Sequence, residues 1–192
     1  MNDIREDRSK WISRLEIDSR FPMDTIIDKF DGTDNTFLSN FYPFEIRYGG
    51  EDFQTTEHAY QYMKAVKGSK AEDGQLWTDK IRLASTPAKT KKYGRQCPLV
   101  PDWEEIKLGI MKGVLIQKFK DTPLWEKLDA TGNAYLIEGN TWHDNQFGIC
   151  VKKNCERGCW KKKGQNKLGL FLMQLRAIER GEYGFVQEYL SR

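Results

Sequence analysis

The chain has 192 residues and contains no run of about 18 apolar residues, the length that a helix needs to cross a bilayer. Its first ten residues, MNDIREDRSK, lack the apolar stretch of a signal peptide. Net charge is low as well, because 31 Lys and Arg against 28 Asp and Glu leave +3. That excludes a purely electrostatic nucleic-acid binder, which needs a large uncompensated positive charge. We expect a soluble, cytoplasmic protein that contacts no membrane.

Several familiar motifs are also missing. The sequence has no GxGxxG, no GxxxxGK[ST] and no HExxH, so neither a Rossmann-type nucleotide site nor a zinc-protease site is expected. It has no internal repeat and no Pro/Ser-rich linker. Hydrophobic residues make up 39% and aromatic residues 12%, which is enough for a packed core and excludes wholesale disorder.

Cysteine is scarce, with Cys97 alone and Cys150, Cys155 and Cys159 in a C-x4-C-x3-C cluster. Without an export signal the expected state is the reduced thiol. Structural zinc sites usually contain closer cysteine pairs, and a fourth ligand would have to come from Cys97 or His143. We therefore expect no stoichiometric metal and no cofactor.

Periodicity and capping residues predict an α+β fold, a helix-rich single domain with a small, mostly antiparallel sheet. Residues 1–24 are expected to form an N-terminal extension, with an amphipathic helix or a loosely docked segment around Trp11, and residues 25–192 the domain. Predicted strands cover 25–30, a hairpin at 44–53 that turns at Gly49-Gly50, and 135–138. Predicted helices cover 57–66, 87–93, 102–119, 123–131 and 167–180.

One of these helices carries a polar stripe. At 100° per residue, Glu57, Gln61 and Lys64 share a face, with Tyr60 beside them. Glu57 and Lys64 lie about 10 Å apart along the axis, which suits two groups that flank a small ligand. The alternative is structural, since an acid in the first turn and a base in the last also match the helix dipole.

Three other segments could present polar groups to a ligand. Asp144 and Trp142 lie in a loop between Gly139 and Gly148, which could bind a ligand or form an Asx turn with Trp142 as a packing anchor. Ser39 and Asn40 stand among aromatic residues in a segment that could hold a base or sugar, or form a structured turn. A basic run at 152–167 contains Trp160, and most of its lysines are expected to be solvated surface.

Many short motifs together resemble the YbiA-like family, also called NADAR, over about residues 26–178 and in the family's order. They are Phe30-Asp-Gly, Phe37-Leu-Ser-Asn-Phe41, Thr56-Glu-His-Ala-Tyr-Gln61 with Lys64-Ala65, Pro87-Ala-Lys89, Gly94-Arg95, Trp103 with Lys107 and Met111, Lys118-Phe119, Thr131-Gly132, Glu138, Asp144 with Gly148, and Gly164-x-Asn166-x-Leu-Gly169 with Leu172-Met173 and Arg176.

The resemblance implies the family's fold and an N-glycosidase, which cleaves the bond between ribose C1 and a nitrogen. Family members act on ribosylaminouracil phosphates of the riboflavin pathway or remove ADP-ribose from guanine. It further implies that Lys64 is the motif lysine and that Glu57 and Asp144 are the motif carboxylates. The chain departs from the family at Phe147, where Trp is usual, and the cysteine insertion occurs in only part of the family.

We therefore expect an N-glycosidase that acts on a phosphoribosyl- or ADP-ribosyl-linked base, as a small-molecule nucleotide or as ADP-ribosylated nucleic acid. Either a carboxylate would stabilise the positive charge that develops at C1 and the ring oxygen, or Lys64 would attack C1 and hold the sugar as an imine, and Glu57 or Asp144 would protonate the leaving nitrogen. The alternatives are a catalytically silent ADP-ribose or NAD-binding module and, less favoured, a nucleic-acid binder using the 152–167 run. The residues expected to bind substrate are Ser39, Asn40, Phe41, Tyr60, Gln61, Arg95, Trp142 and Phe147.

Overall fold

The computed structural model describes residues 4–32 and 34–182. These residues form two compact units whose boundaries cross the sequence: unit 1 combines the segment up to Ser39 with the segment from Glu126 onward, and unit 2 is Asn40–Trp125. No helix in the described part of the chain is both long enough and apolar enough to span a membrane.

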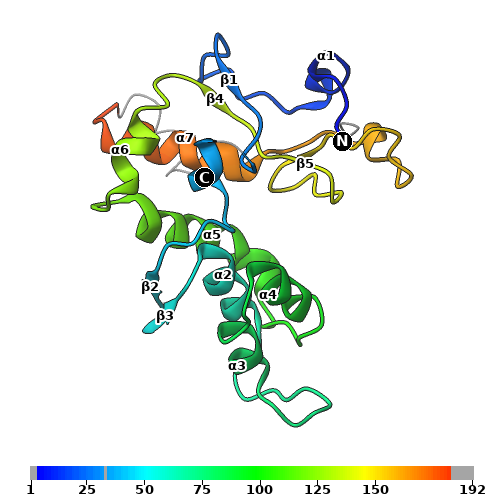
Figure 1. The fold of residues 1–192 in the computed structure, drawn as a ribbon, viewed down its shortest axis with the longest axis vertical. Coiled ribbons are helices and arrows are strands. Elements are labelled where there is room, and N and C mark those ends of the chain that lie inside the picture. Colours follow the sequence, from blue (N-terminus) through cyan, green and yellow to red (C-terminus); the bar gives the residue numbers. More distant parts are fainter. Residues whose placement is uncertain (1–3, 33, 183–192) are drawn as a thin grey trace. The chain divides into compact units, whose positions relative to one another are not determined.

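Unit 2 is built around a nine-residue helix. Helix α2 (Thr56–Lys64) contacts three other helices, as Figure 1 shows, and the hairpin of β2 (Ile46–Tyr48) and β3 (Glu51–Phe53) packs beside it. The three helices are α3 (Trp77–Arg82), α4 (Pro87–Gly94) and α5 (Trp103–Phe119). The short helix α6 (Leu124–Asp129) contains the boundary between the units.

Unit 1 has a 13-residue helix, α7 (Lys167–Glu179), packed against β4 (Tyr135–Leu136) (Figure 1). Gly169 permits this contact, because a Cβ there would lie 2.0 Å from the carbonyl oxygen of Leu136. The other elements are α1 (Arg8–Trp11), η1 (Ile12–Arg14), β1 (Ile26–Ile27), η2 (Asp34–Leu38), β5 (Gly139–Asn140), β6 (Ile149–Cys150) and η3 (Cys159–Lys161). The core includes Trp11 and Leu15, so the N-terminal segment is docked in its described part.

The α+β, helix-rich architecture predicted from the sequence is confirmed. The 44–53 hairpin turns at Gly49 and Gly50, both with positive φ (61° and 90°), as their pairing predicted. Thr55 and Thr86 cap α2 and α4 through side-chain oxygens. Asp102, in contrast, makes no side-chain capping bond to α5.

Among the three strand pairs of the described residues, only one has the expected antiparallel character. β2 and β3 are antiparallel, whereas β1 pairs with β4 and β5 with β6 in parallel. Parallel partners cannot be joined by a tight turn, and all of unit 2 lies in the chain between β1 and β4. Unit 2 thus occupies the place of a crossover connection. The predicted division at residue 24 stays a prediction, and residues 1–3, 33 and 183–192 lie outside the described residues.

Candidate functional site

The first turn of α2 is fixed by buried hydrogen bonds. The Thr56 hydroxyl donates to the main-chain and side-chain oxygens of Asn40, each at 3.1 Å, and the Glu57 amide donates to the Asn40 carbonyl. His58 is fully buried between Thr55 and the Ala84 carbonyl. His58 therefore has a structural role, because both of its ring nitrogens lie within hydrogen-bond distance of protein oxygens.

Glu57 and Gln61 form a buried pair one turn apart, as their spacing predicted. They are 4% and 5% exposed, and Gln61 Nε2 donates to Glu57 Oε1 at 2.9 Å. Gln61 Oε1 is buried and has no hydrogen-bond partner in the described chain. It lies against Gly94 of α4, where a Cβ would come within 2.0 Å of it. Only glycine leaves room for the amide in this position.

Lys64 ends α2 with its side chain half-buried. The backbone is held here because Lys64 O accepts from the Val100 amide at 3.1 Å. The amine lies 6.0 Å from the Trp103 ring centroid, and no ion pair to it is found within 4–32 and 34–182. Burial lowers the pKa of Lys64, and the charge of Arg95 lowers it further, whereas Cys97 and Glu57 oppose the shift. A half-buried amine with a lowered pKa is suited to nucleophilic attack.

Four further predicted residues belong to the same unit as Lys64. Tyr60 is 7% exposed and meets Trp103 edge to face, with centroids 5.1 Å apart. Arg95 is exposed just after α4, and Phe41 is 38% exposed with Lys91 Nζ 5.6 Å from its ring. The side chain of Asn40 accepts a hydrogen bond from Thr56 at the start of α2 and donates one to Met111 Sδ, so its contact with substrate stays a prediction.

The Asp144 loop in unit 1 is an Asx turn, the structural alternative that its composition allowed. Asp144 Oδ1 accepts from the amides of Gln146 and Phe147, both at 2.9 Å. Asn140 braces the loop, since its Nδ2 donates to Asp144 O and its Oδ1 accepts from the amides of Trp142 and Asp144. Within the described residues, Asp144 Oδ2 accepts no hydrogen bond from the loop.

The remaining predicted residues in unit 1 are at least partly accessible. Trp142 is 42% exposed, and Phe147 and Ser39 are partly buried. In the basic run, Trp160 is 57% exposed, with Lys161 Nζ 5.0 Å from its ring. Lys152 pairs with Glu156 and Lys163 donates to Ser13 O, so part of this positive charge has local partners.

The structure adds two residues to the candidate site in unit 2. Trp103 and Gly94 contact the polar stripe of α2 from other helices, and the sequence showed both only as family motifs.

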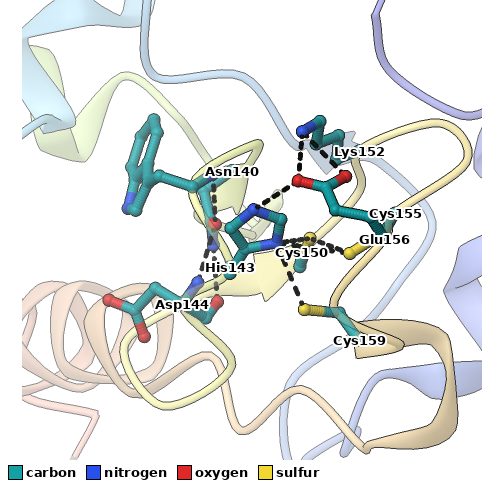
Figure 2. Close-up of polar contacts among 9 residues, drawn as sticks. Asn140, His143, Asp144, Cys150, Lys152, Cys155, Glu156 and Cys159 are labelled. Carbon is teal, nitrogen blue, oxygen red and sulfur yellow. Dashed lines mark hydrogen bonds and ion pairs between the residues drawn. The ribbon is translucent and has the colours of Figure 1, made fainter.

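His143, one of the two candidate fourth ligands, lies beside the three clustered cysteines. Its ligand atom and the Sγ atoms of Cys150, Cys155 and Cys159 all lie within 4.8 Å of one another (Figure 2). Of the two residues that could complete a ligand set with these cysteines, His143 is therefore the one within reach.

Comparison with protein families gives a match to the NADAR domain over residues 29–178, a range that includes all of unit 2 and much of unit 1. The N-glycosidase YbiA of Escherichia coli strain K12 is 31% identical over 168 residues, covering 82% of this chain and 92% of the relative. A riboflavin biosynthesis protein of Vibrio vulnificus is 30% identical over 160 residues, or 79% of this chain and 38% of that longer protein.

A solved structure is similar as well. The NMR structure of the E. coli protein YbiA matches with a TM-score of 0.64 at 32% identity, over 84% of this chain and 90% of that chain. This similarity extends across most of the sequence, so it concerns the fold as a whole rather than one motif.

Proposed function

We propose, from the premise that this chain belongs to the NADAR domain family and is an N-glycosidase, that it uses Lys64 to cleave the bond between ribose C1 and a base nitrogen. The substrate class that we propose is a phosphoribosyl- or ADP-ribosyl-linked base. The riboflavin biosynthesis relative from Vibrio vulnificus favours ribosylaminouracil phosphates within that class.

The observation that carries this proposal is the Lys64 amine, half-buried and without an ion pair in the described chain, on the same helix as the buried carboxylate of Glu57. A ligand-binding stripe alone needs no amine with a lowered pKa, and a helix-dipole role would leave Lys64 solvated. Burial of the amine lowers its pKa and so raises the neutral fraction near pH 7, the form that can attack carbon.

The reaction proceeds in balanced steps. The neutral Lys64 amine attacks C1 while the C1–N bond breaks, and the leaving nitrogen takes a proton from Glu57, the candidate acid. The C1–Nζ adduct then opens to an imine, with the ring oxygen taking the proton that the amine loses. Water adds to the protonated imine and releases the open-chain sugar with its 5′-phosphate or ADP group still attached, which returns Lys64 to the neutral amine and a proton to Glu57.

Other groups of unit 2 bind and orient. Gln61 holds the Glu57 carboxylate through its Nε2 proton, which fixes the direction of the acid. Exposed Arg95 provides a bidentate cation for a 5′-phosphate or diphosphate. We further propose that Asp144, the second motif carboxylate, contributes to the same reaction, and that Phe147 and Trp142 stack on the base.

The test is to incubate the protein with ribosylaminouracil phosphate, with an oligonucleotide that carries ADP-ribosylated guanine, and with NAD, and to assay released base. Release from the first or second substrate supports the proposal. Binding of ADP-ribose without release from any substrate would instead identify a catalytically silent module.

Borohydride added during turnover should reduce the imine and leave a covalent sugar adduct on Lys64. The adduct should be absent in Lys64→Arg, which keeps the charge but cannot form the imine. It should persist in Lys67→Ala, a matched control at an exposed lysine three residues later. An adduct on another residue would refute the role of Lys64.

A further inference from the structure

The 150–159 segment contains a buried cluster unlike the rest of the core. Cys150, Cys155 and Cys159 are 1%, 8% and 5% exposed and form a cluster with no other hydrophobic member in the described residues. All are free thiols. Buried groups that pack mainly on one another, with a histidine beside them, suggest a ligand set rather than a piece of core. We propose that His143, Cys150, Cys155 and Cys159 bind one zinc ion.

The distances fit a single tetrahedral ion. With Zn–S near 2.3 Å and Zn–N near 2.0–2.1 Å, tetrahedral geometry separates two sulfurs by about 3.8 Å and a sulfur from a nitrogen by about 3.6 Å. His143 Nδ1 lies 3.2, 3.5 and 3.9 Å from the sulfurs of Cys155, Cys159 and Cys150. Cys150 and Cys155 Sγ are 3.9 Å apart. Four donor atoms therefore surround one point.

The outer nitrogen of His143 has the partner that metal-bound histidines usually have. Figure 2 shows Nδ1 directed at the sulfurs and the other ring nitrogen at Glu156, with Nε2 3.5 Å from Glu156 Oε1. Lys152 holds that carboxylate through contacts of 2.9 and 3.0 Å. A carboxylate on this side favours the proton on Nε2 and leaves the Nδ1 lone pair for the ion. Glu156 is thus a positioning residue.

Positive φ angles shape the loops that carry the ligands. His143 itself has φ 72°, a region that histidine enters rarely, and Asn154 (52°) and Gly158 (63°) directly precede Cys155 and Cys159. The Asn140 side chain holds the main chain on either side of His143. The structure therefore holds His143 in an unfavourable conformation that brings its ring to the three sulfurs.

The ligand set selects the metal and its role. Three thiolates and one imidazole are typical of zinc, and four protein ligands leave no open position, so the ion is structural rather than catalytic. An iron–sulfur cluster is disfavoured because it holds its cysteines on separate irons and thus farther apart. Binding Zn²⁺ displaces three thiol protons and leaves a complex of charge −1, beside the lysine-rich run.

The ion would join three parts of unit 1. Cys150 lies on β6, His143 precedes Asp144 in the Asx-turn loop, and Cys155 and Cys159 flank the turn that follows. The N-terminal segment is attached to the same region, since the Glu6 amide donates to Val151 O and the Lys153 amide to Ile4 O, at 2.7 and 2.8 Å. Zinc would therefore stabilise the Asp144 loop and the docking site of the N-terminal segment together.

The test starts with the full chain, purified under reducing conditions with any polyhistidine tag removed, and elemental analysis should find one zinc per chain. Chelator-stripped protein should take up Co²⁺ with the visible absorption of a tetrahedral site and a thiolate charge-transfer band. Uptake of zinc at pH 7 should release up to three protons. Wild-type protein that stays metal-free after reduction and zinc reconstitution, or that contains a Cys150–Cys155 disulfide as purified, would overturn the proposal.

Variants separate ligands from bystanders. Cys155→Ser should lower zinc affinity by more than about a hundredfold, and Glu156→Gln by about 10–100-fold, the usual effect of removing an outer partner. Cys97→Ser is the matched control, because Cys97 is a buried cysteine of unit 2 and its replacement should leave zinc content unchanged.

If Cys155→Ser does not fold, the variant His143→Cys decides. It should keep the metal and change the cobalt spectrum to that of four thiolates. An unchanged spectrum, or zinc lost equally in Cys97→Ser, would refute the assignment.

Discussion

Helix α2 and the cysteine loop (residues 143–159) hold their functional groups by different means. In α2, main-chain hydrogen bonds set the positions, so Glu57 and Gln61 meet because they are one turn apart. In the cysteine loop there is little regular structure, and the groups converge through side-chain braces such as Asn140 and through positive φ angles. The helix would keep its shape without a ligand, whereas the loop depends on what its four ligands bind.

This difference separates reactivity from stability. α2 offers an amine with a lowered pKa and a buried carboxylate, which are reactive groups. The cysteine loop offers the four side chains of the proposed zinc site, which would leave no open position for a substrate. A change in α2 should therefore alter the reaction rate, and a change in the cysteine loop should alter stability.

The largest effect is expected for Lys64→Ala. Removing the nucleophile should lower the rate of base release by at least about a thousandfold, since the loss of a covalent nucleophile commonly costs this much or more. Zinc content and the thermal midpoint should stay near those of the wild type, because Lys64 contributes no ligand and ends its helix. The measurements are single-turnover kinetics and elemental analysis on the same preparation. Activity within tenfold of the wild type would exclude the imine mechanism.

Chelation should produce the opposite pattern. Removing zinc should raise amide hydrogen exchange of residues 149–153 by at least about tenfold, because the ligands would no longer hold β6 and the following turn. Amides in the middle of α2 should exchange at their former rate. Exchange measured by mass spectrometry on peptides from both regions checks this. Equal increases in amide hydrogen exchange in the two regions would show that zinc stabilises the whole chain. That result would contradict the separation of reactivity in α2 from stability in the cysteine loop.

The sequence predicted α2 and its stripe because local rules determine both. Threonine caps, a 3.6-residue period and the i, i+4 spacing of Glu57 and Gln61 need no knowledge of other segments. The Gly49-Gly50 turn was predictable for the same reason. Helix α3 was not expected, since it has six residues and Leu76 at its N-cap makes no capping bond.

Long-range contacts explain what the sequence could not predict. The parallel pairing of β1 with β4 depends on strands separated in the chain by unit 2, and Trp103 comes to Lys64 from another helix. For the proposed zinc ligands, the C-x4-C-x3-C spacing argued against zinc because no close pair was present, and elemental analysis decides between that expectation and the proposal. His143 turns toward the sulfurs through a positive φ that its sequence neighbours do not signal.

Gly94→Ala should disturb α2 without touching the cysteine loop. The new Cβ would lie 2.0 Å from Gln61 Oε1 and 3.1 Å from Gln61 Cβ, so the buried amide must move and its bond to Glu57 is strained. We expect a loss of about 1–3 kcal/mol in the free energy of unfolding, the usual cost of overpacking. Denaturant titration measures it. Gly109→Ala, in α5 with open space at its Cβ, is the control and should stabilise by about 0.5–1 kcal/mol.

A double variant tests the cause of that loss. Adding Gln61→Ala to Gly94→Ala removes the atoms that the new methyl group meets, so the two changes should be less costly together than the sum of the single changes. Additive free energies would mean that Gln61 moves aside freely and that Gly94 has another role.

The smallest effect is expected in the pH dependence of the rate, and it tests the state of the Lys64 amine directly. Only the neutral amine attacks carbon and only protonated Glu57 can donate, so the profile should be bell-shaped, and its limb at low pH should rise about tenfold per pH unit as the Lys64 amine loses its proton. Burial lowers the pKa of this amine below the ordinary 10.5, which moves the rise toward neutral pH.

The charge of Arg95 lowers the pKa of Lys64 further. Arg95→Ala should therefore raise the pKa and shift the rise to higher pH, whereas Lys92→Ala, at an exposed cation in the last turn of α4, should leave it in place. Profiles of kcat at saturating substrate separate this shift from any loss of phosphate binding. A rise that stays fixed in Arg95→Ala would mean that the titrating group is not Lys64.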